Sequence, residues 1–222
     1  MQSVYTWARS EDMSKYLKED GTKYRMFEGL QPLANDLENP YWIINKNNLK
    51  DKTNRLTASV YFNAEITKWF DISYKYGIDT YTRKDRTLLA PNGAVREMYQ
   101  NGRLSEVDNT YEYLSSNLMM TFKHKIADFD FNLLLGNAIE STRFKNDSRT
   151  GFNFIVPNFF SFENIKDDSK KFSSTSSLKR IAGLFGEFRV AYKNYAYLTA
   201  SIRNDWSSSL VSSTLSNKGN YS

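Results

Sequence analysis

The chain has 222 residues, of which 40% are hydrophobic and 15% are aromatic, including 15 Tyr and 15 Phe. This length allows one large all-β unit or two small domains. The absence of cysteine excludes a disulfide framework, a thiolate metal site and a cysteine nucleophile. The formal net charge is +5, but Lys and Arg are scattered among Asp and Glu, so the basic patch of a nucleic-acid-binding protein is not predicted.

The first part of the chain, residues 1–53, shows little strand alternation and is predicted to be an extracellular loop region with one short helix. Ser10 would cap this helix, Glu11 and Asp12 would occupy its first turn, and Gly21 would end it. The ten N-terminal residues lack the apolar core of a signal peptide. No run of 18 apolar residues occurs in the chain, so no transmembrane helix is predicted.

A regular alternation of apolar and polar residues begins at Leu56 and recurs through residues 54–206. Period two over eleven residues is a strong strand signal. The apolar sets that share one face are Leu56, Ala58, Val60, Phe62, Ala64 and Ile66; Phe70, Ile72, Tyr74, Tyr76 and Ile78; Leu114, Leu118, Met120 and Phe122; Phe129, Phe131, Leu133 and Leu135; Leu184, Phe188, Val190 and Tyr192; and Ala196, Leu198, Ala200 and Ile202. The pattern predicts three hairpins with very short turns.

Long polar segments separate the three predicted hairpins. We expect loops over about 81–109, which contains the turn signal Pro91-Asn92-Gly93, and over about 140–179. Loops of this length are unusual inside a compact domain. Residues 207–222 are expected to begin a further outer loop.

Short turns on one side and long loops on the other are typical of outer-membrane β-barrels. Strands of about 12 residues, tilted by about 45°, span roughly the bilayer's hydrocarbon core, whereas strands of soluble proteins usually have about 5–6 residues. Aromatic residues near the strand ends would form an interfacial belt: these are Trp69, Phe70, Tyr192, Tyr195 and Trp206. We therefore predict an all-β fold, an antiparallel up-and-down transmembrane β-barrel segment of about six long strands.

The alternative is a soluble carbohydrate-binding β-sandwich domain. In that fold the apolar faces would be buried against a second sheet about 10 Å away. A single sheet without a second layer would favour the barrel.

Several segments also resemble a known family. The run from Arg180 to Gly186, and the run from Tyr197 to Leu210 that includes Arg203-Asn204-Asp205-Trp206-Ser207-Ser208, resemble the barrel of SusC/RagA-type TonB-linked outer-membrane transporters. Asn39-Pro40-Tyr41-Trp42 and Val156-Pro157-Asn158-Phe159-Phe160-Ser161 are similar to the same family. The resemblance covers about residues 35–210.

This resemblance implies uptake of oligosaccharides or peptides across the outer membrane of a Gram-negative, Bacteroidota-type cell. It implies energy from the TonB complex and a SusD-like surface lipoprotein that caps the barrel. The family also has a signal peptide, a TonB-box segment, a plug domain and about 22 strands, the size class of plugged transporters. The chain is therefore expected to be an internal barrel fragment that lacks the plug domain.

No catalytic, cofactor-binding or metal-binding residue is predicted, and we expect the chain not to be an enzyme. His124 is the only histidine, which excludes a metal site built from two or more histidines of this chain, and it is interpreted as a structural or interfacial residue. Two carboxylate pairs are interpreted as solvated turn and loop residues, because pairs with tuned pKa values need burial: Asp128 with Asp130, and Asp167 with Asp168.

The substrate-binding residues are unknown from the sequence, and the only candidates lie in the second long loop. Phe159, Phe160 and Phe162 would stack on a sugar ring or contact a partner. The other interpretation is that they pack within their own loop, as apolar residues of ordered loops commonly do.

Overall fold

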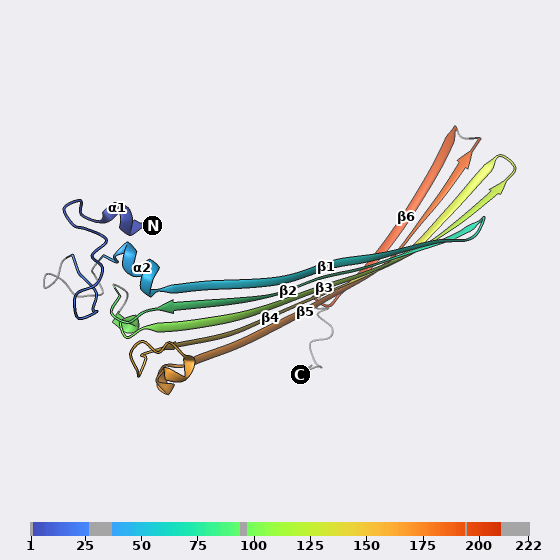
Figure 1. Cartoon of the computed structure of the whole chain (residues 1–222). Coiled ribbons are helices and arrows are strands. Elements are labelled where there is room, and N and C mark those ends of the chain that lie inside the picture. The colour runs from blue at the N-terminus through green and yellow to red at the C-terminus, as the bar shows by residue number, and fades with distance from the viewer. Residues whose placement is uncertain (1, 27–36, 94–96, 194, 210–222) are drawn as a thin grey trace. The chain divides into compact units, whose positions relative to one another are not determined.

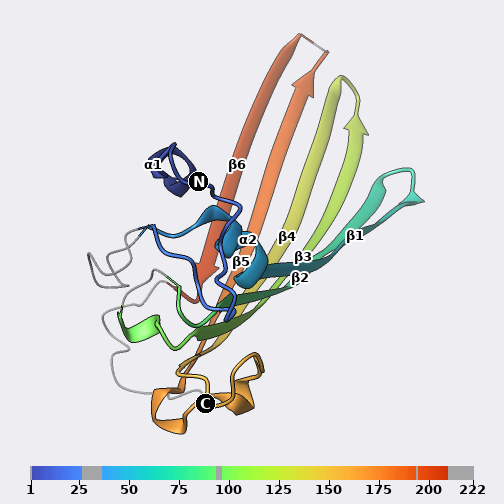
Figure 2. The same cartoon turned by 60° about the vertical axis from the view of Figure 1, so that its left-hand side comes forward.

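A computed structural model describes residues 2–26, 37–93, 97–193 and 195–209 (Figure 1). Six strands form one sheet in the order β1-β2-β3-β4-β5-β6, so each strand pairs with its neighbours in the chain. Figure 2 shows their directions alternating. The bounds are β1 Asn48–Thr67, β2 Phe70–Leu89, β3 Arg103–Ile126, β4 Phe129–Phe152, β5 Lys171–Tyr192 and β6 Ala196–Ser207. The predicted run of six long antiparallel strands is confirmed.

The turns within the hairpins are as short as the alternation indicated. Only Lys68 and Trp69 separate β1 from β2, and only Ala127 and Asp128 separate β3 from β4. Ala127 has φ +50° and Lys193, which follows β5, has φ +48°. Left-handed backbone of this kind fits the right-handed twist of the flanking strands.

The strands extend much further than the sequence predicted, because β1 to β5 contain 20 to 24 residues each. The predicted loops over 81–109 and 140–179 were therefore too long, and the connections are 90–102 and 153–170. Charged and polar side chains occupy both faces of the added strand segments. The apolar alternation ends there, although backbone pairing does not depend on it.

The N-terminal region also differs from the prediction. Its helices are α1 Gln2–Thr6 and α2 Pro40–Lys46, and the helix predicted from Ser10 is absent. Asp12 instead accepts hydrogen bonds from the Ser14 amide at 3.0 Å and hydroxyl at 2.7 Å, a local turn that competes with helix formation. Strand β1 begins at Asn48 rather than at residue 54.

Helix α2 begins where its capping residues dictate. Asn39 is fully buried and accepts a hydrogen bond from the Tyr41 amide at 2.8 Å, and Pro40 occupies the first helical position, where a missing N–H is harmless. The short 3-10 helices are η2 Glu97–Tyr99, η3 Phe162–Asn164 and η4 Asp167–Ser169. No helix in the described ranges is long and apolar enough to cross a membrane.

The chain divides into two compact units. The first unit comprises residues 1–53, 83–109 and 146–175, and the second comprises 54–82, 110–145 and 176–222. The first unit has a small core of buried residues with three phenylalanines packed against it: Leu88, Leu104 and Ile165, with Phe154, Phe160 and Phe162. In the described part of the second unit, Ala191 is the only buried hydrophobic residue.

Candidate functional site

The loop between β4 and β5, residues 153–170, is ordered around the buried amide of Asn164. Its Oδ1 accepts a hydrogen bond from the Val156 amide at 2.8 Å, and its Nδ2 donates to the carbonyls of Val156 at 2.7 Å and Phe159 at 2.5 Å. One side chain thus supplies partners to three backbone groups that would otherwise lack them. Nothing in the sequence pattern singled out Asn164.

The three candidate phenylalanines do not share one environment. Phe160 and Phe162 pack against the core of the first unit, and Phe160 meets Phe154 edge to face at 5.3 Å between ring centroids. Phe159 is 55% exposed. The self-packing interpretation fits Phe160 and Phe162, which are half-buried, whereas Phe159 is exposed.

Charged side chains border this loop. Glu106 forms ion pairs with Arg86 at 3.1 Å and with Arg149 at 2.5 Å, and Arg86 also donates to the Phe160 carbonyl at 2.8 Å. The Arg149 guanidinium lies 5.3 Å from the Phe162 ring centroid. Together these residues line an open hollow of about 390 Å³. Because two guanidinium groups share one carboxylate here, the surface of the hollow is suited to a polar, partly anionic ligand.

A neighbouring hollow of about 480 Å³ contains more acidic residues. Glu106, Asp108 and Asp147 line it, and Asp147 accepts a hydrogen bond from the Ser174 hydroxyl at 2.6 Å. Within the described ranges, no group of three or more His, Cys, Asp or Glu side chains is arranged to hold a metal ion.

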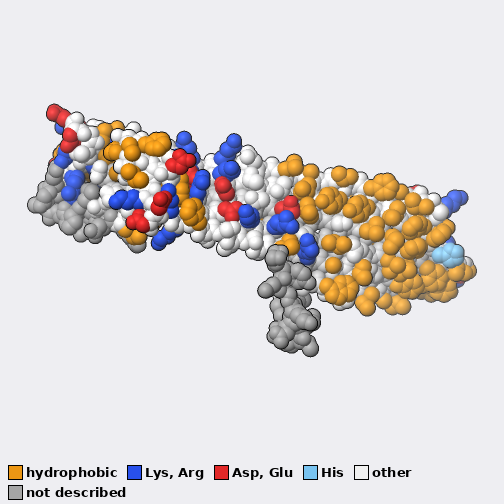
Figure 3. Space-filling model, turned by 90° about the horizontal axis from the view of Figure 1, so that it is seen from below, with side chains coloured by type: hydrophobic (Ala, Val, Ile, Leu, Met, Phe, Trp, Pro, Cys, Tyr) orange, Lys and Arg blue, Asp and Glu red, His pale blue; other side chains and the backbone are white. Residues whose placement is uncertain are grey.

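The second unit has an apolar face, and none of the other described residues of that unit covers it. Figure 3 shows hydrophobic side chains gathered near the tight turns of the sheet. The exposed fractions are 69% for Val60, 69% for Leu198 and 76% for Ile202. A soluble monomer rarely leaves such a continuous apolar surface in water.

Aromatic side chains are concentrated at the tight-turn end of the second unit. Phe70 stacks on Phe122 with ring centroids 4.8 Å apart, and Tyr192 lies 4.7 Å from Phe129 and 5.5 Å from Tyr195. Four of the five predicted belt residues, Trp69, Phe70, Tyr192 and Tyr195, belong to this end. Trp206 lies at the far end of β6 and is 51% exposed.

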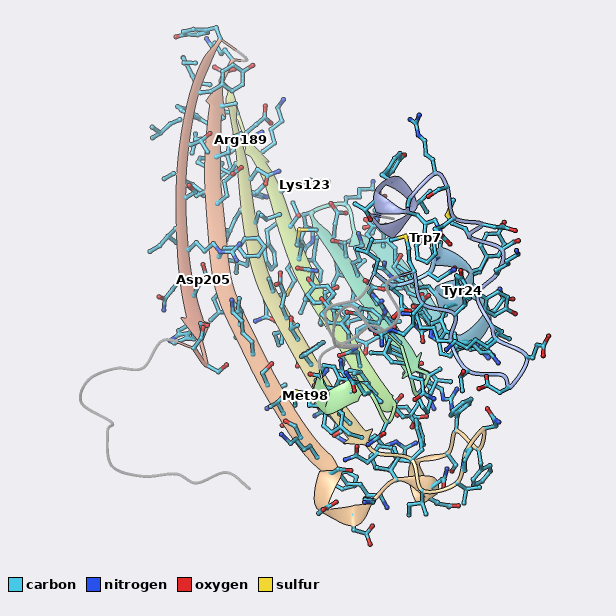
Figure 4. All side chains as sticks on the ribbon, turned by 90° about the vertical axis from the view of Figure 1, so that its left-hand side faces the viewer. Trp7, Tyr24, Met98, Lys123, Arg189 and Asp205 are labelled. Carbon is cyan, nitrogen blue, oxygen red and sulfur yellow. The ribbon has the colours of Figure 1, made fainter. Side chains whose placement is uncertain are left out.

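Charged pairs occupy the opposite, polar face of the second unit. Arg55 donates to both carboxylate oxygens of Asp79, at 2.8 and 2.6 Å, and Lys123 forms an ion pair with Asp71. Lys123 and Arg189, labelled in Figure 4, line a common hollow of about 370 Å³ near the turns. These charges are compatible with a water-filled space and not with hydrocarbon.

The remaining residues considered for chemistry do not form a catalytic arrangement. His124 lies at the end of β3 and borders the same hollow as Lys123. Asp128 pairs with Lys193 at 3.3 Å and Asp130 with Lys125 at 3.5 Å. Asp130 is half-buried, and the other side chains are exposed.

The second carboxylate pair lies in the 3-10 helix η4. Asp167 pairs with Lys170 at 2.7 Å and is 95% exposed, and Asp168 is exposed as well. The hydrogen bond from Lys170, together with its positive charge, lowers the pKa of Asp167 below its ordinary value. A lowered pKa keeps this carboxyl ionised, which is the reverse of what a general acid requires.

Comparison with known proteins identifies a structural likeness. No family model matches the chain, and no curated protein matches it. Among solved structures, one of the RagAB peptide transporter matches with a TM-score of 0.72 and 16% identity over 87% of this chain and 22% of that chain. The RagAB peptide importer in its "closed-closed" and "open-open" states matches with TM-scores of 0.70 and 0.62, both at 16% identity over 86% of this chain.

The matched proteins are much longer than this chain, which spans 21–22% of their length. At 16% identity the likeness shows the fold and not the function. The chain has the fold of a segment of the RagAB transporter, a run of consecutive long antiparallel strands in one sheet.

Proposed function

We propose that this chain forms part of the wall of an outer-membrane β-barrel, and that the barrel belongs to a TonB-dependent nutrient importer of the SusC/RagA type. The uncovered apolar face of the second unit is the observation that carries the first half of the proposal. Burial of apolar surface contributes about 25 cal/mol per Å², so a face exposed to water along six strands calls for lipid or another apolar layer.

The strand lengths support the same conclusion. Twenty residues at about 3.3 Å each, tilted by about 45°, rise roughly 47 Å along the membrane normal, more than the roughly 30 Å hydrocarbon core. The strands would thus cross the bilayer and continue into water. Their polar segments, such as 83–89 and 103–109, would then form the part outside the membrane.

The importer assignment rests on the structural likeness to the RagAB transporter together with the sequence resemblance. The charged face of the second unit would line the lumen, and the loop at 153–170 would belong to the outer rim of the barrel. Transport by such an importer would also require a plug domain coupled to the TonB complex. A SusD-like lipoprotein would bind at the rim, and the cargo would be peptide or oligosaccharide, with Phe159 as the residue best placed to contact it.

The soluble β-sandwich alternative required a second sheet against the apolar faces. The described ranges contain one six-stranded sheet, so no observation favours that alternative.

The membrane assignment is tested by fluorescence quenching in vesicles with brominated acyl chains. The chain has four tryptophans, of which Trp7 and Trp42 are buried in the first unit. In a variant that retains only Trp69 and Trp206, we expect strong quenching. In the matched variant that retains only Trp7 and Trp42, we expect little. Equal, weak quenching in both would refute the membrane assignment.

The importer assignment needs a separate experiment in the cell that makes the protein. Deletion of its gene should abolish growth on oligopeptides or on oligosaccharides as the nutrient while leaving growth on free amino acids and monosaccharides unchanged. Unaltered growth on both polymer classes would contradict the importer role without affecting the membrane assignment.

A further inference from the structure

A groove crosses the apolar face of the second unit. It has a volume of about 550 Å³, and strands β3 to β6 contribute its walls. Leu135, Leu184 and Ile202 are among its lining residues, and the lining contains no acidic side chain. Its polar members are the amides of Asn137 and Asn204.

The groove exists because a glycine lies on its floor. Gly186 pairs with Ile202 of β6, and a Cβ added at position 186 would lie 3.3 Å from Leu135 Cδ2 and 4.0 Å from Ile202 Cγ2. A larger side chain would therefore project into the space between these two residues. Because glycine has no side chain, position 186 leaves this space between Leu135 and Ile202 unfilled.

Trp206 lies at one end of the groove, and the cation Arg180 lies beyond it. Trp206 pairs with Ala182. Arg180, two residues from Ala182 on the same face, lies about 7 Å further along the strand. Its backbone pairs with Ser208, whose hydroxyl accepts from the Arg180 amide at 2.9 Å. The Arg180 guanidinium is exposed and forms no ion pair within the described residues.

We propose that this groove binds one membrane lipid with an anionic phosphate headgroup. Its acyl chain would lie over Gly186 between Leu135 and Ile202, and its phosphate would accept hydrogen bonds from Arg180. An unpaired guanidinium next to an apolar groove complements an anionic amphiphile, because such a ligand satisfies both the charge and the hydrophobic surface. The indole of Trp206 would lie at the boundary between chain and headgroup.

This inference rests on the proposed function, because it requires the apolar face to contact lipid. The experiment therefore begins with the full chain in vesicles of equal parts phosphatidylglycerol and phosphatidylcholine that carry brominated chains. Quenching of the two exposed tryptophans, Trp69 and Trp206, reports insertion. Native mass spectrometry after detergent extraction then counts the phospholipids of each class that stay bound.

We expect the unaltered chain to retain phosphatidylglycerol in preference to phosphatidylcholine. Arg180→Gln should reduce that preference about fivefold, the effect of one basic residue at a membrane surface. Lys179→Gln is the matched control, because it removes a charge at the same depth on the opposite face of β5, and it should leave the preference unchanged. Gly186→Leu should lower retention of both lipids, because it fills the groove.

The outcomes separate the two claims. If no variant shows quenching, the membrane assignment and the lipid site both fail. If the chain inserts but retains both lipids equally, or if Lys179→Gln has the same effect as Arg180→Gln, the lipid site alone is refuted.

Discussion

The ring of Phe185 lies directly against Gly136 on the neighbouring strand, so that a Cβ at position 136 would overlap with the ring. The Arg203 guanidinium lies 5.7 Å from the centroid of the same ring. Because glycine has no side chain, the backbone around it would otherwise be exposed, and an aromatic ring from the adjacent strand covers it. This contact joins β4, β5 and β6 in the second unit.

Gly136→Ala should therefore destabilise the second unit by about 2 kcal/mol, within the range for overpacked sites. Gly77→Ala is the control, because the nearest atom to its added Cβ is the Ser115 hydroxyl at 2.8 Å, the end of a side chain that can rotate away. The free energy of unfolding, measured by denaturant titration in detergent micelles, should fall less for the control. Equal losses would show that the ring does not restrict position 136.

The order of the loop at 153–170 depends on Asn164. Asn164→Ala removes three hydrogen bonds and leaves two carbonyls and one amide without partners, which should cost about 2–3 kcal/mol. The loss should be local, so hydrogen exchange of the amides of residues 153–165 should speed up while that of β6 stays unchanged.

Asn158→Gly is the control for this loop. Asn158 has φ +58°, a backbone conformation that glycine adopts freely, so exchange in that variant should change little. Unaltered exchange in Asn164→Ala would mean that the hydrogen bonds of Asn164 do not order the loop.

The ion pair between Lys23 and Glu38 is nearly enclosed. The two side chains are 2% and 14% exposed and lie 3.0 Å apart. Lys23→Met would leave the carboxylate of Glu38 buried without its counter-charge, which should destabilise the first unit by about 3 kcal/mol. The double variant Lys23→Met with Glu38→Leu should recover most of that loss, because no unpaired charge remains.

The exposed pair of Arg189 and Glu187, at 3.1 Å, gives the comparison. Arg189→Met should change the free energy of unfolding by less than about 1 kcal/mol, as is usual for surface pairs. If Lys23→Met has an equally small effect, the enclosed pair does not stabilise the first unit.

The sequence predicted the hairpins of the second unit because one face must be apolar there. Apolar residues recur with period two around Leu56 and around Ile202. This alternation stops where neither face of the sheet is apolar. In the polar segments, side-chain hydrogen bonds between neighbouring strands accompany the backbone pairing, such as Asn146 Nδ2 to Asn109 Oδ1 at 2.7 Å and Ser105 to Thr150 at 2.9 Å. Their partners are 37 and 45 residues apart, so no local pattern reveals them.

In the candidate site, too, some features follow from the local sequence and others arise only from tertiary contacts. Aromatic composition pointed to Phe159, Phe160 and Phe162, but only tertiary contacts decide which of them is exposed. Asn164 and Glu106 have ordinary neighbours in sequence, and their importance arises from the groups that the fold brings to them. Residue type thus predicted the loop and not its organisation.

The pKa of Asp167 gives a prediction about pH. The hydrogen bond and charge of Lys170 hold this pKa below 3.8 in the folded protein. A carboxyl with a lowered folded-state pKa stabilises the fold above its unfolded pKa and loses that contribution as the pH falls through the folded value. The stabilisation is therefore present at neutral pH and is lost only in strong acid.

Lys170→Gln should raise the pKa of Asp167 toward 3.8, and the titration of its carboxyl carbon by NMR measures this directly. Lys166→Gln removes a charge from the same loop, but the lowered pKa of Asp167 is caused by Lys170, so that variant should leave the titration unchanged. Because Asp167 is 95% exposed, the solvent screens the pair, and the change in overall stability should be too small to detect. An unshifted titration in Lys170→Gln would show that Lys170 does not pair with Asp167 in solution.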